Sequence, residues 1–241
     1  MSDQEIVFFD LPSRPPKKAW SYNPWKTRFV LNFKGIPYKT EFIEYPEIKP
    51  RFQDHFPKDT EEFTVPTIIL PDGTWVMDSW KIAEVLEEKY PEPSILLDSP
   101  YLKKLRGVLS QVMEPLTAIK VCNVYNNILS EASQPYFRRT REEDIGKTFE
   151  KLAEEQSDEA AWKASEPYFH QVTAFLQENP EGPFFEGKTP GFADFVWAGN
   201  LIFFIRMGGN VFADALKASG DADTHLKLLE GLKPWSERDD Y

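Results

Sequence analysis

Cysteine and histidine are scarce in this sequence: its 241 residues include one cysteine, Cys122, and three histidines. A single cysteine excludes an internal disulfide and a Cys-x-x-Cys redox pair, and this usage suits a reducing compartment, so we expect a cytoplasmic location. The histidines, His55, His170 and His225, are not spaced as metal ligands are, and we expect no bound metal. Cys122 lies among apolar residues and is expected to be a small core residue.

Long apolar runs and a surplus of basic residues are also missing. The longest apolar candidate, residues 201–205, is far shorter than the ~20 residues that span a bilayer, and residues 1–5 do not resemble a secretion signal. The 39 acidic residues outnumber the 28 basic ones, and the resulting formal charge of −11 repels nucleic acids and anionic membranes. We therefore expect neither a membrane nor a nucleic acid as a partner.

The N-terminal part of the chain alternates between strand and helix patterns. Apolar and alternating stretches predict strands at residues 5–11, 38–45, 64–70 and 74–77. Helices are predicted at 23–33, as a short element at 49–55, and from residue 78 to the residue before Pro91. The order strand, helix, strand predicts a parallel pair with a right-handed crossover, and the Pro-Asp-Gly sequence at 71–73 predicts an antiparallel hairpin. Together these patterns predict a mixed four-stranded sheet.

Strand-like alternation stops at the proline-rich residues 91–100, and helical spacing follows. We place a domain boundary there, between a first domain at residues 1–92 and an all-helical domain at residues 99–241. Helices are predicted at 102–119 with a bend at Pro115, at 140–155, at 158–178 and from residue 192, where Asp194 can cap the first turn. The tail after Lys233 is polar and is expected to lie on the surface.

The segment at residues 20–28 is the first candidate for a functional site. Asn23 is a favoured N-cap residue and Pro24 suits the first helical position, so a helix is expected to begin here. A helix N-terminus stabilises anions, a thiolate among them, and the hydroxyl of Ser21 lies beside this one. On local sequence alone, a serine in this place most often serves the turn itself. Three basic side chains of the helix are expected to face water: Lys26, Arg28 and Lys34.

Two further motifs follow Ser21 in a specific order: Val65-Pro66, and Asp78-Ser79 at the start of the helix after the hairpin. With this order and spacing, nearly the whole chain resembles the glutathione S-transferases. The resemblance implies an α+β two-domain fold, in which a thioredoxin-like domain with the mixed sheet precedes the all-helical domain. The segments 20–28, 38–41 and 75–83 resemble the etherase-related transferases of fungi, particularly the group called fungal class A.

The resemblance also implies roles for residues at the site. Ser21 would hold the glutathione sulfur, with Asn23 and its backbone N–H beside it. Pro66 would be a cis-proline, and the backbone of Val65 would pair with the cysteinyl part of glutathione as an added strand does.

The two ends of the tripeptide are assigned in the same way. Asp78 and Ser79 would bind the γ-glutamyl end, with its ammonium held by Asp78 or by an acidic residue of a partner subunit. The glycyl carboxylate needs a cation or an amide, and four candidates stay open: Lys49, Gln53, His55 and Lys58.

The resulting hypothesis is a glutathione transferase of serine type that uses glutathione as co-substrate and activates its thiol for conjugation, peroxide reduction or aryl-ether cleavage. The alternative is a ligandin, a non-catalytic carrier of aromatic compounds such as wood-derived phenolics. In both cases a second, mostly apolar ligand is expected between the loop at 12–22 and the helix carrying Met113, Pro115 and Leu116. The resemblance further implies a homodimer.

Overall fold

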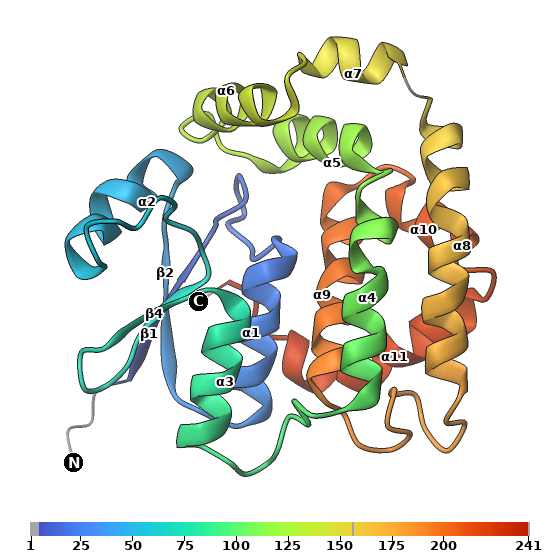
Figure 1. Cartoon of the computed structure of the whole chain (residues 1–241), viewed down its shortest axis with the longest axis horizontal. Coiled ribbons are helices and arrows are strands. Elements are labelled where there is room, and N and C mark those ends of the chain that lie inside the picture. The colour runs from blue at the N-terminus through green and yellow to red at the C-terminus, as the bar shows by residue number, and fades with distance from the viewer. Residues whose placement is uncertain (1–4, 156, 241) are drawn as a thin grey trace.

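The computed structural model describes residues 5–155 and 157–240 of the chain. Two expectations concern residues outside these ranges. The N-terminal segment, in which we expect no secretion signal, includes residues 1–4, and the predicted domains begin at residue 1 and end at residue 241. Within the described ranges, a mixed sheet with three helices forms one part and a larger group of helices forms the other (Figure 1).

The sheet has the strand order β2-β1-β3-β4. Its strands are β1 (Ile6–Asp10), β2 (Tyr38–Phe42), β3 (Thr67–Ile69) and β4 (Trp75–Met77). β1 runs parallel to β2, with Phe8 opposite Thr40, and β3 runs antiparallel to both β1 and β4. The predicted parallel unit and hairpin are confirmed, but the strand predicted at 64–70 is shorter, because residues 64–66 leave the sheet as a loop.

The helices of this part are α1 (Tyr22–Phe33), α2 (Tyr45–Phe52) and α3 (Ser79–Lys89), and a turn of 3-10 helix at Gln53–His55 extends α2. The strand predicted to reach residue 45 ends at Phe42. The reason lies at Glu44 and Glu47: the side chain of Glu47 accepts from the backbone N–H of Glu44 at 3.1 Å, and the backbone N–H of Glu47 donates to the carbonyl oxygen of Glu44 at 2.9 Å. This reciprocal cap, with Pro46 in the first turn, starts α2 earlier than the sequence pattern predicts.

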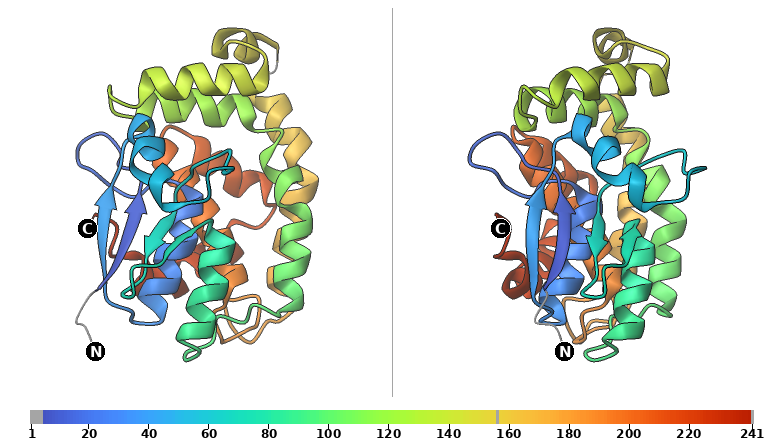
Figure 2. Two further views of the ribbon diagram at one scale, coloured as in Figure 1. Left: turned by 60° about the vertical axis from the view of Figure 1, so that its left-hand side comes forward. Right: turned by 90° about the vertical axis from the view of Figure 1, so that its left-hand side faces the viewer.

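The larger part is built from helices, as predicted. Its elements are α4 (Pro100–Met113), α5 (Thr117–Asn123), a π-helical turn (Val124–Ile128), α6 (Gln134–Ile145), α7 (Phe149–Glu155), α8 (Asp158–Gln177), α9 (Phe192–Met207), α10 (Val211–Ala218) and α11 (Ala222–Ser236). The bend predicted at Pro115 is a complete break between α4 and α5, and the helix predicted at 140–155 is two helices separated at Gly146. Figures 1 and 2 show α5 and α6 lying across one end of the molecule, above α2.

α1 is enclosed on both sides, because it packs against the sheet and α3 on one side and against α9 on the other (Figure 1). Eight consecutive residues, from Pro24 to Leu31, are buried. α9 approaches closely where it has a glycine: a Cβ on Gly199 would lie 3.1 Å from the carbonyl oxygen of Tyr22. α9 is buried along nearly its whole length, yet no helix within the described ranges is long and apolar enough to cross a membrane.

At the start of α9, Asp194 caps the first turn as predicted. Its carboxylate accepts from the backbone N–H of Gly191 at 2.8 Å and from that of Phe185 at 2.9 Å. Burial raises the pKa of Asp194 to about 7 in spite of these two hydrogen bonds. The carboxyl group therefore joins the loop before α9 to the helix itself.

The prediction that Arg28 and Lys34 face water is wrong. The Lys34 side chain is fully buried and its ammonium donates to Glu87 and to the carbonyl oxygens of Tyr90 and Pro93, at 2.6–2.8 Å. It thereby ties the end of α1 to the end of α3. A helix that is covered on two faces cannot expose these side chains, so they are buried together with hydrogen-bond partners.

Arg28 forms an ion pair with Asp10 that is fully buried on both sides, with Nη2 2.8 Å from Oδ2. The guanidinium also lies 5.0 Å from the ring centroid of Phe8 and donates to Tyr38 and Thr40. Burial raises the pKa of Asp10 even though the Arg28 cation opposes the shift. The pair joins the end of β1 to the middle of α1.

The C-terminal tail does not simply lie on the surface as predicted. Its Arg238 guanidinium lies 3.7 Å from the ring centroid of Tyr38 and donates to the Tyr38 carbonyl oxygen. The carbonyl of Asp239 accepts from the N–H of Ala19 at 2.7 Å, and its carboxylate pairs with Lys18. The tail therefore fastens the loop before Ser21 to the rest of the molecule.

Replacing Arg28 by alanine is expected to lower the free energy of unfolding by about 3–5 kcal/mol, because Asp10 is left buried without its cation. Urea denaturation measures the change. The control is Lys227→Ala, which breaks the exposed pair with Asp223 and should leave the unfolding curve unchanged. A loss below ~1 kcal/mol in Arg28→Ala would contradict a dominant role for the buried pair.

Candidate active site

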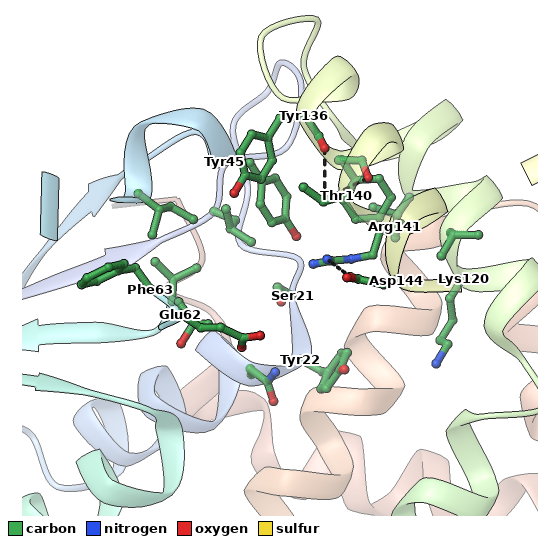
Figure 3. Close-up of a pocket in the computed structure, with 18 of the residues that line it drawn as sticks. Ser21, Tyr22, Tyr45, Glu62, Phe63, Lys120, Tyr136, Thr140, Arg141 and Asp144 are labelled. Atoms are coloured by element: carbon green, nitrogen blue, oxygen red, sulfur yellow. Dashed lines mark hydrogen bonds and ion pairs between the residues drawn. The ribbon is translucent and has the colours of Figure 1, made fainter. Parts of the chain in front are cut away.

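A cavity of about 660 Å³ lies where the sheet part meets α5 and α6. One wall consists of residues 20–23 and of the loop at 61–65, and the other consists of α5 and α6 (Figure 3). The predicted residues Ser21, Asn23, Lys49 and Val65 all line it, so segments far apart in the sequence meet here as expected.

Ser21, not Asn23, is the N-cap of α1, which begins at Tyr22. The predicted cap is two residues too late, and Pro24 occupies the third helical position instead of the first. Ser21 has extended backbone angles, and its hydroxyl makes no capping hydrogen bond. Among the described residues this hydroxyl has no hydrogen-bond partner, and it faces the cavity (Figure 3). It is therefore available to a ligand at the positive end of the helix dipole.

Lys26 is buried, contrary to prediction, and its ammonium donates to the Asn23 side-chain oxygen at 2.7 Å. It also lies 5.6 Å and 5.4 Å from the ring centroids of Tyr22 and Trp80. Burial lowers the pKa of Lys26 to about 8, although the nearby Asp78 carboxylate favours the charged form. The sequence analysis did not identify Lys26 as a site residue. Its position three residues after Asn23 on one helix indicates that the two side chains lie on the same face.

The Val65–Pro66 peptide bond is cis, as the resemblance implies. Val65 lines the cavity, and within the described part of the chain neither its N–H nor its carbonyl oxygen has a hydrogen-bond partner. Both groups are therefore open to an extended ligand. The neighbouring carbonyl of Pro66 accepts from the N–H of Asp78 at 3.2 Å, so the second and third motifs lie side by side.

Asp78 caps α3 by accepting from the N–H groups of Trp80 and Lys81 at 2.9 and 3.1 Å. Its backbone has a positive φ of 85°, which is uncommon for a residue other than glycine. The side chain of Asp78 is exposed, whereas Ser79 is buried. The pair does not line the cavity itself, but Asp78 binds the carbonyl of Pro66, which follows the cavity-lining Val65.

The structure distinguishes among the four residues that are candidates for binding the glycyl carboxylate. Lys49 is exposed on α2 and lines the cavity. His55 lies outside the cavity lining and stacks on Trp75, with ring centroids 4.0 Å apart. Gln53 and Lys58 are exposed and also lie outside the lining. The geometry therefore favours Lys49 and disfavours His55.

The far half of the cavity is aromatic, but its wall differs from the prediction. Met113 and Leu116 are buried in the core, and the helical wall consists of α5 and α6 instead. Tyr45 stacks on Tyr136 at 6.2 Å and packs against Phe137 at 5.5 Å between centroids. Burial raises the pKa of Tyr45 to about 12. These rings form an apolar enclosure beside Ser21.

Cys122 lies outside the cavity lining, half-buried, and burial raises the pKa of its thiol. These features favour a packing role over a nucleophilic one. Across the described residues, no group of three or more histidine, cysteine or acidic side chains is arranged to hold a metal ion.

Comparison with known proteins identifies the family. Residues 20–89 match the family model described as the N-terminal domain of glutathione S-transferase, and residues 106–235 match the corresponding C-terminal domain. The chain belongs to the glutathione S-transferase family. The glutathione S-transferase-like protein ustS of Aspergillus flavus is 33% identical over 216 residues, which cover 80% of this chain and 78% of that protein.

Solved structures of fungal transferases share the whole fold. Glutathione transferase GSTFuA3 from Phanerochaete chrysosporium has a TM-score of 0.83 at 29% identity, covering 98% of both chains. A glutathione S-transferase of Ceriporiopsis subvermispora, solved in complex with glutathione, has a TM-score of 0.84 at 30% identity, covering 99% of this chain and all of that one. The expected resemblance to fungal class A, the thioredoxin-like part with its four-stranded sheet, the helical part and the enzyme class are confirmed.

Lys26→Met is expected to stabilise this glutathione transferase at pH 7 by about 1–3 kcal/mol, because the folded state disfavours the ammonium there. The folded pKa of about 8 is lower than the ordinary value of 10.5, so the wild type regains stability as the pH rises from 8 to 10.5. The advantage of the variant should shrink over the same range. Urea denaturation at pH 7 and pH 10, with the exposed Lys163→Met as control, measures both effects. A less stable variant at pH 7 would refute the assignment.

Proposed function

We propose that the chain is a glutathione transferase of serine type, in which Ser21 donates a hydrogen bond to the thiolate of glutathione. The observation that carries this proposal is the free N-cap hydroxyl of Ser21, which faces the cavity at the start of α1. The backbone N–H groups of Tyr22 and Asn23 lie in the same first turn, where the helix itself provides no acceptor. Together they favour the thiolate over the thiol and so create a nucleophile at neutral pH.

Other residues in and next to the same cavity wall are proposed to bind the rest of the glutathione molecule. The open N–H and carbonyl groups of Val65 suit the cysteinyl backbone, which would pair with this loop as one short strand pairs with another. Asp78 and Ser79 adjoin this position and are proposed to bind the γ-glutamyl end. Lys49 is proposed to bind the glycyl carboxylate.

The aromatic half of the cavity is proposed to hold the second substrate, a small apolar or aromatic electrophile. Three reactions use the same nucleophile: conjugation, peroxide reduction and aryl-ether cleavage. The enclosure by Tyr45, Tyr136 and Phe137 also suits a second candidate function, in which a ligandin stores aromatic compounds without turnover. Steady-state turnover with aryl halides, hydroperoxides and β-aryl ethers separates the enzyme from the ligandin.

We also propose that residues 1–92 and 99–241 are two domains. The proposal is supported by the connection between α3 and α4, which spans residues 90–99 without regular secondary structure. The cavity then lies between the domains, a common position for ligand sites.

Ser21→Ala is expected to lower kcat/KM about 10- to 100-fold while changing glutathione affinity less than threefold, because the hydroxyl acts on the thiolate and other groups hold the tripeptide. Turnover of an aryl halide and calorimetric binding of glutathione measure the two quantities. Ser110→Ala, at an exposed position on α4, is the control. An unchanged rate would transfer the role to the backbone N–H groups or to Asn23.

The chain is further proposed to be a homodimer, as the resemblance implies. Sedimentation at micromolar concentration should then give twice the 28.0 kDa mass of one chain. A protein that binds glutathione with the mass of a single chain would contradict the proposal.

A further inference from the structure

The half of the cavity opposite the loop at 61–65 contains a cation that the proposed chemistry does not use. Lys120 lies on α5 and lines the cavity with Val121 and Val124. Its side chain is half-buried, and within residues 5–155 and 157–240 its ammonium has no hydrogen-bond or ion-pair partner. Figure 3 shows Lys120 on the same side of the cavity as Arg141, across from Glu62 and Phe63.

Lys120 differs from the other two cations that line the cavity. Lys49 is exposed on α2, at the end of the cavity assigned to glutathione. Arg141 pairs with Asp144 at 3.0 Å and lies 5.3 Å from the ring centroid of Phe137, so a carboxylate already balances its charge. Among the cations on the α5 and α6 wall, Lys120 is therefore the one that no described carboxylate pairs with.

This charge is costly where it lies. Burial lowers the pKa of Lys120 to about 8, and the nearby Glu114 only partly opposes that shift. A leucine would pack against the two valines without desolvating an ammonium. The net charge of −11 also repels anions from the protein as a whole, so a local cation is needed wherever an anion is to bind.

We propose that the second substrate or ligand of this transferase is an aromatic acid, whose carboxylate binds the ammonium of Lys120 while its ring occupies the cavity in front of Val121 and Val124 on the same wall. The proposal rests on the proposed function only in taking this half of the cavity as the second-ligand site. It specifies the charge of the ligand, which the apolar and aromatic lining of the cavity does not determine.

The test compares two probes of the same shape, naphthalene carboxylate and the neutral naphthalene carboxamide. Calorimetry measures their dissociation constants at pH 7, with the glutathione half of the site filled by saturating S-methylglutathione. The wild type should bind the carboxylate about tenfold more tightly than the amide, as one charge-assisted contact provides. Lys120→Met, which keeps the apolar stem, should bind both probes equally and should bind the amide as the wild type does.

Two control variants make the result specific. Lys163→Met removes the same charge from an exposed position on α8 and should keep the full preference for the carboxylate. Unchanged binding of the amide shows that Lys120→Met retains a folded cavity. The proposal is overturned by equal binding of the two probes in the wild type, by a preference that survives in Lys120→Met, or by a preference lost only in Arg141→Met.

The same measurements keep this inference apart from the proposed function. Binding is measured without turnover, so a ligandin could satisfy the charge preference while failing every assay with an electrophile. Conversely, turnover of a neutral aryl halide with no preference for the carboxylate would support the transferase and refute the role of Lys120.

Discussion

The buried ion pair between Asp10 and Arg28 is the constraint on which the geometry of the site depends. Asp10 is the last residue of β1, and Arg28 lies near the middle of α1, so the pair fixes the helix against the strand that precedes it. The chain between them must return over residues 11–21 and deliver Ser21 at the mouth of α1. A small shift of the helix would move that hydroxyl away from Val65 on the facing loop. The C-terminal tail adds to this constraint, since Asp239 binds Ala19 in the same loop.

The start of α1 then determines the chemistry available. Ser21 caps the helix through its extended backbone and leaves its hydroxyl unused, whereas a side-chain cap would occupy that oxygen. Pro24 at the third position has no N–H, so the unpaired donors of the first turn are those of Tyr22 and Asn23. These donors and the hydroxyl lie together at one edge of the cavity. The sequence therefore concentrates its anion-binding groups beside Ser21.

Sequence reasoning recovers the order of strands, the cis-proline and the meeting of Ser21 with Val65, because these follow from local patterns and from a resemblance that spans the chain. It fails for Lys26, Arg28 and Lys34. A helical pattern distinguishes an apolar stripe from a polar one, but it does not reveal that both faces of α1 will be covered, one by the sheet and the other by α9. It also fails at the tail and at Pro115, where contacts between distant segments decide the structure. The site residues identified last, Lys26 and Lys120, were missed because isolated lysines on helices usually face solvent.

These two lysines also show how charge is distributed in an acidic protein. Burial lowers the pKa of each to about 8, so each makes folding less favourable at neutral pH. One lies behind Asn23 and near Asp78, at the end assigned to glutathione, and the other lines the cavity on α5. A chain that needed only stability would place apolar residues at both positions. The desolvated ammonium of Lys120 on the cavity wall is consistent with the anionic second ligand proposed above, whereas Lys26, behind the wall, binds the Asn23 side chain at the start of α1.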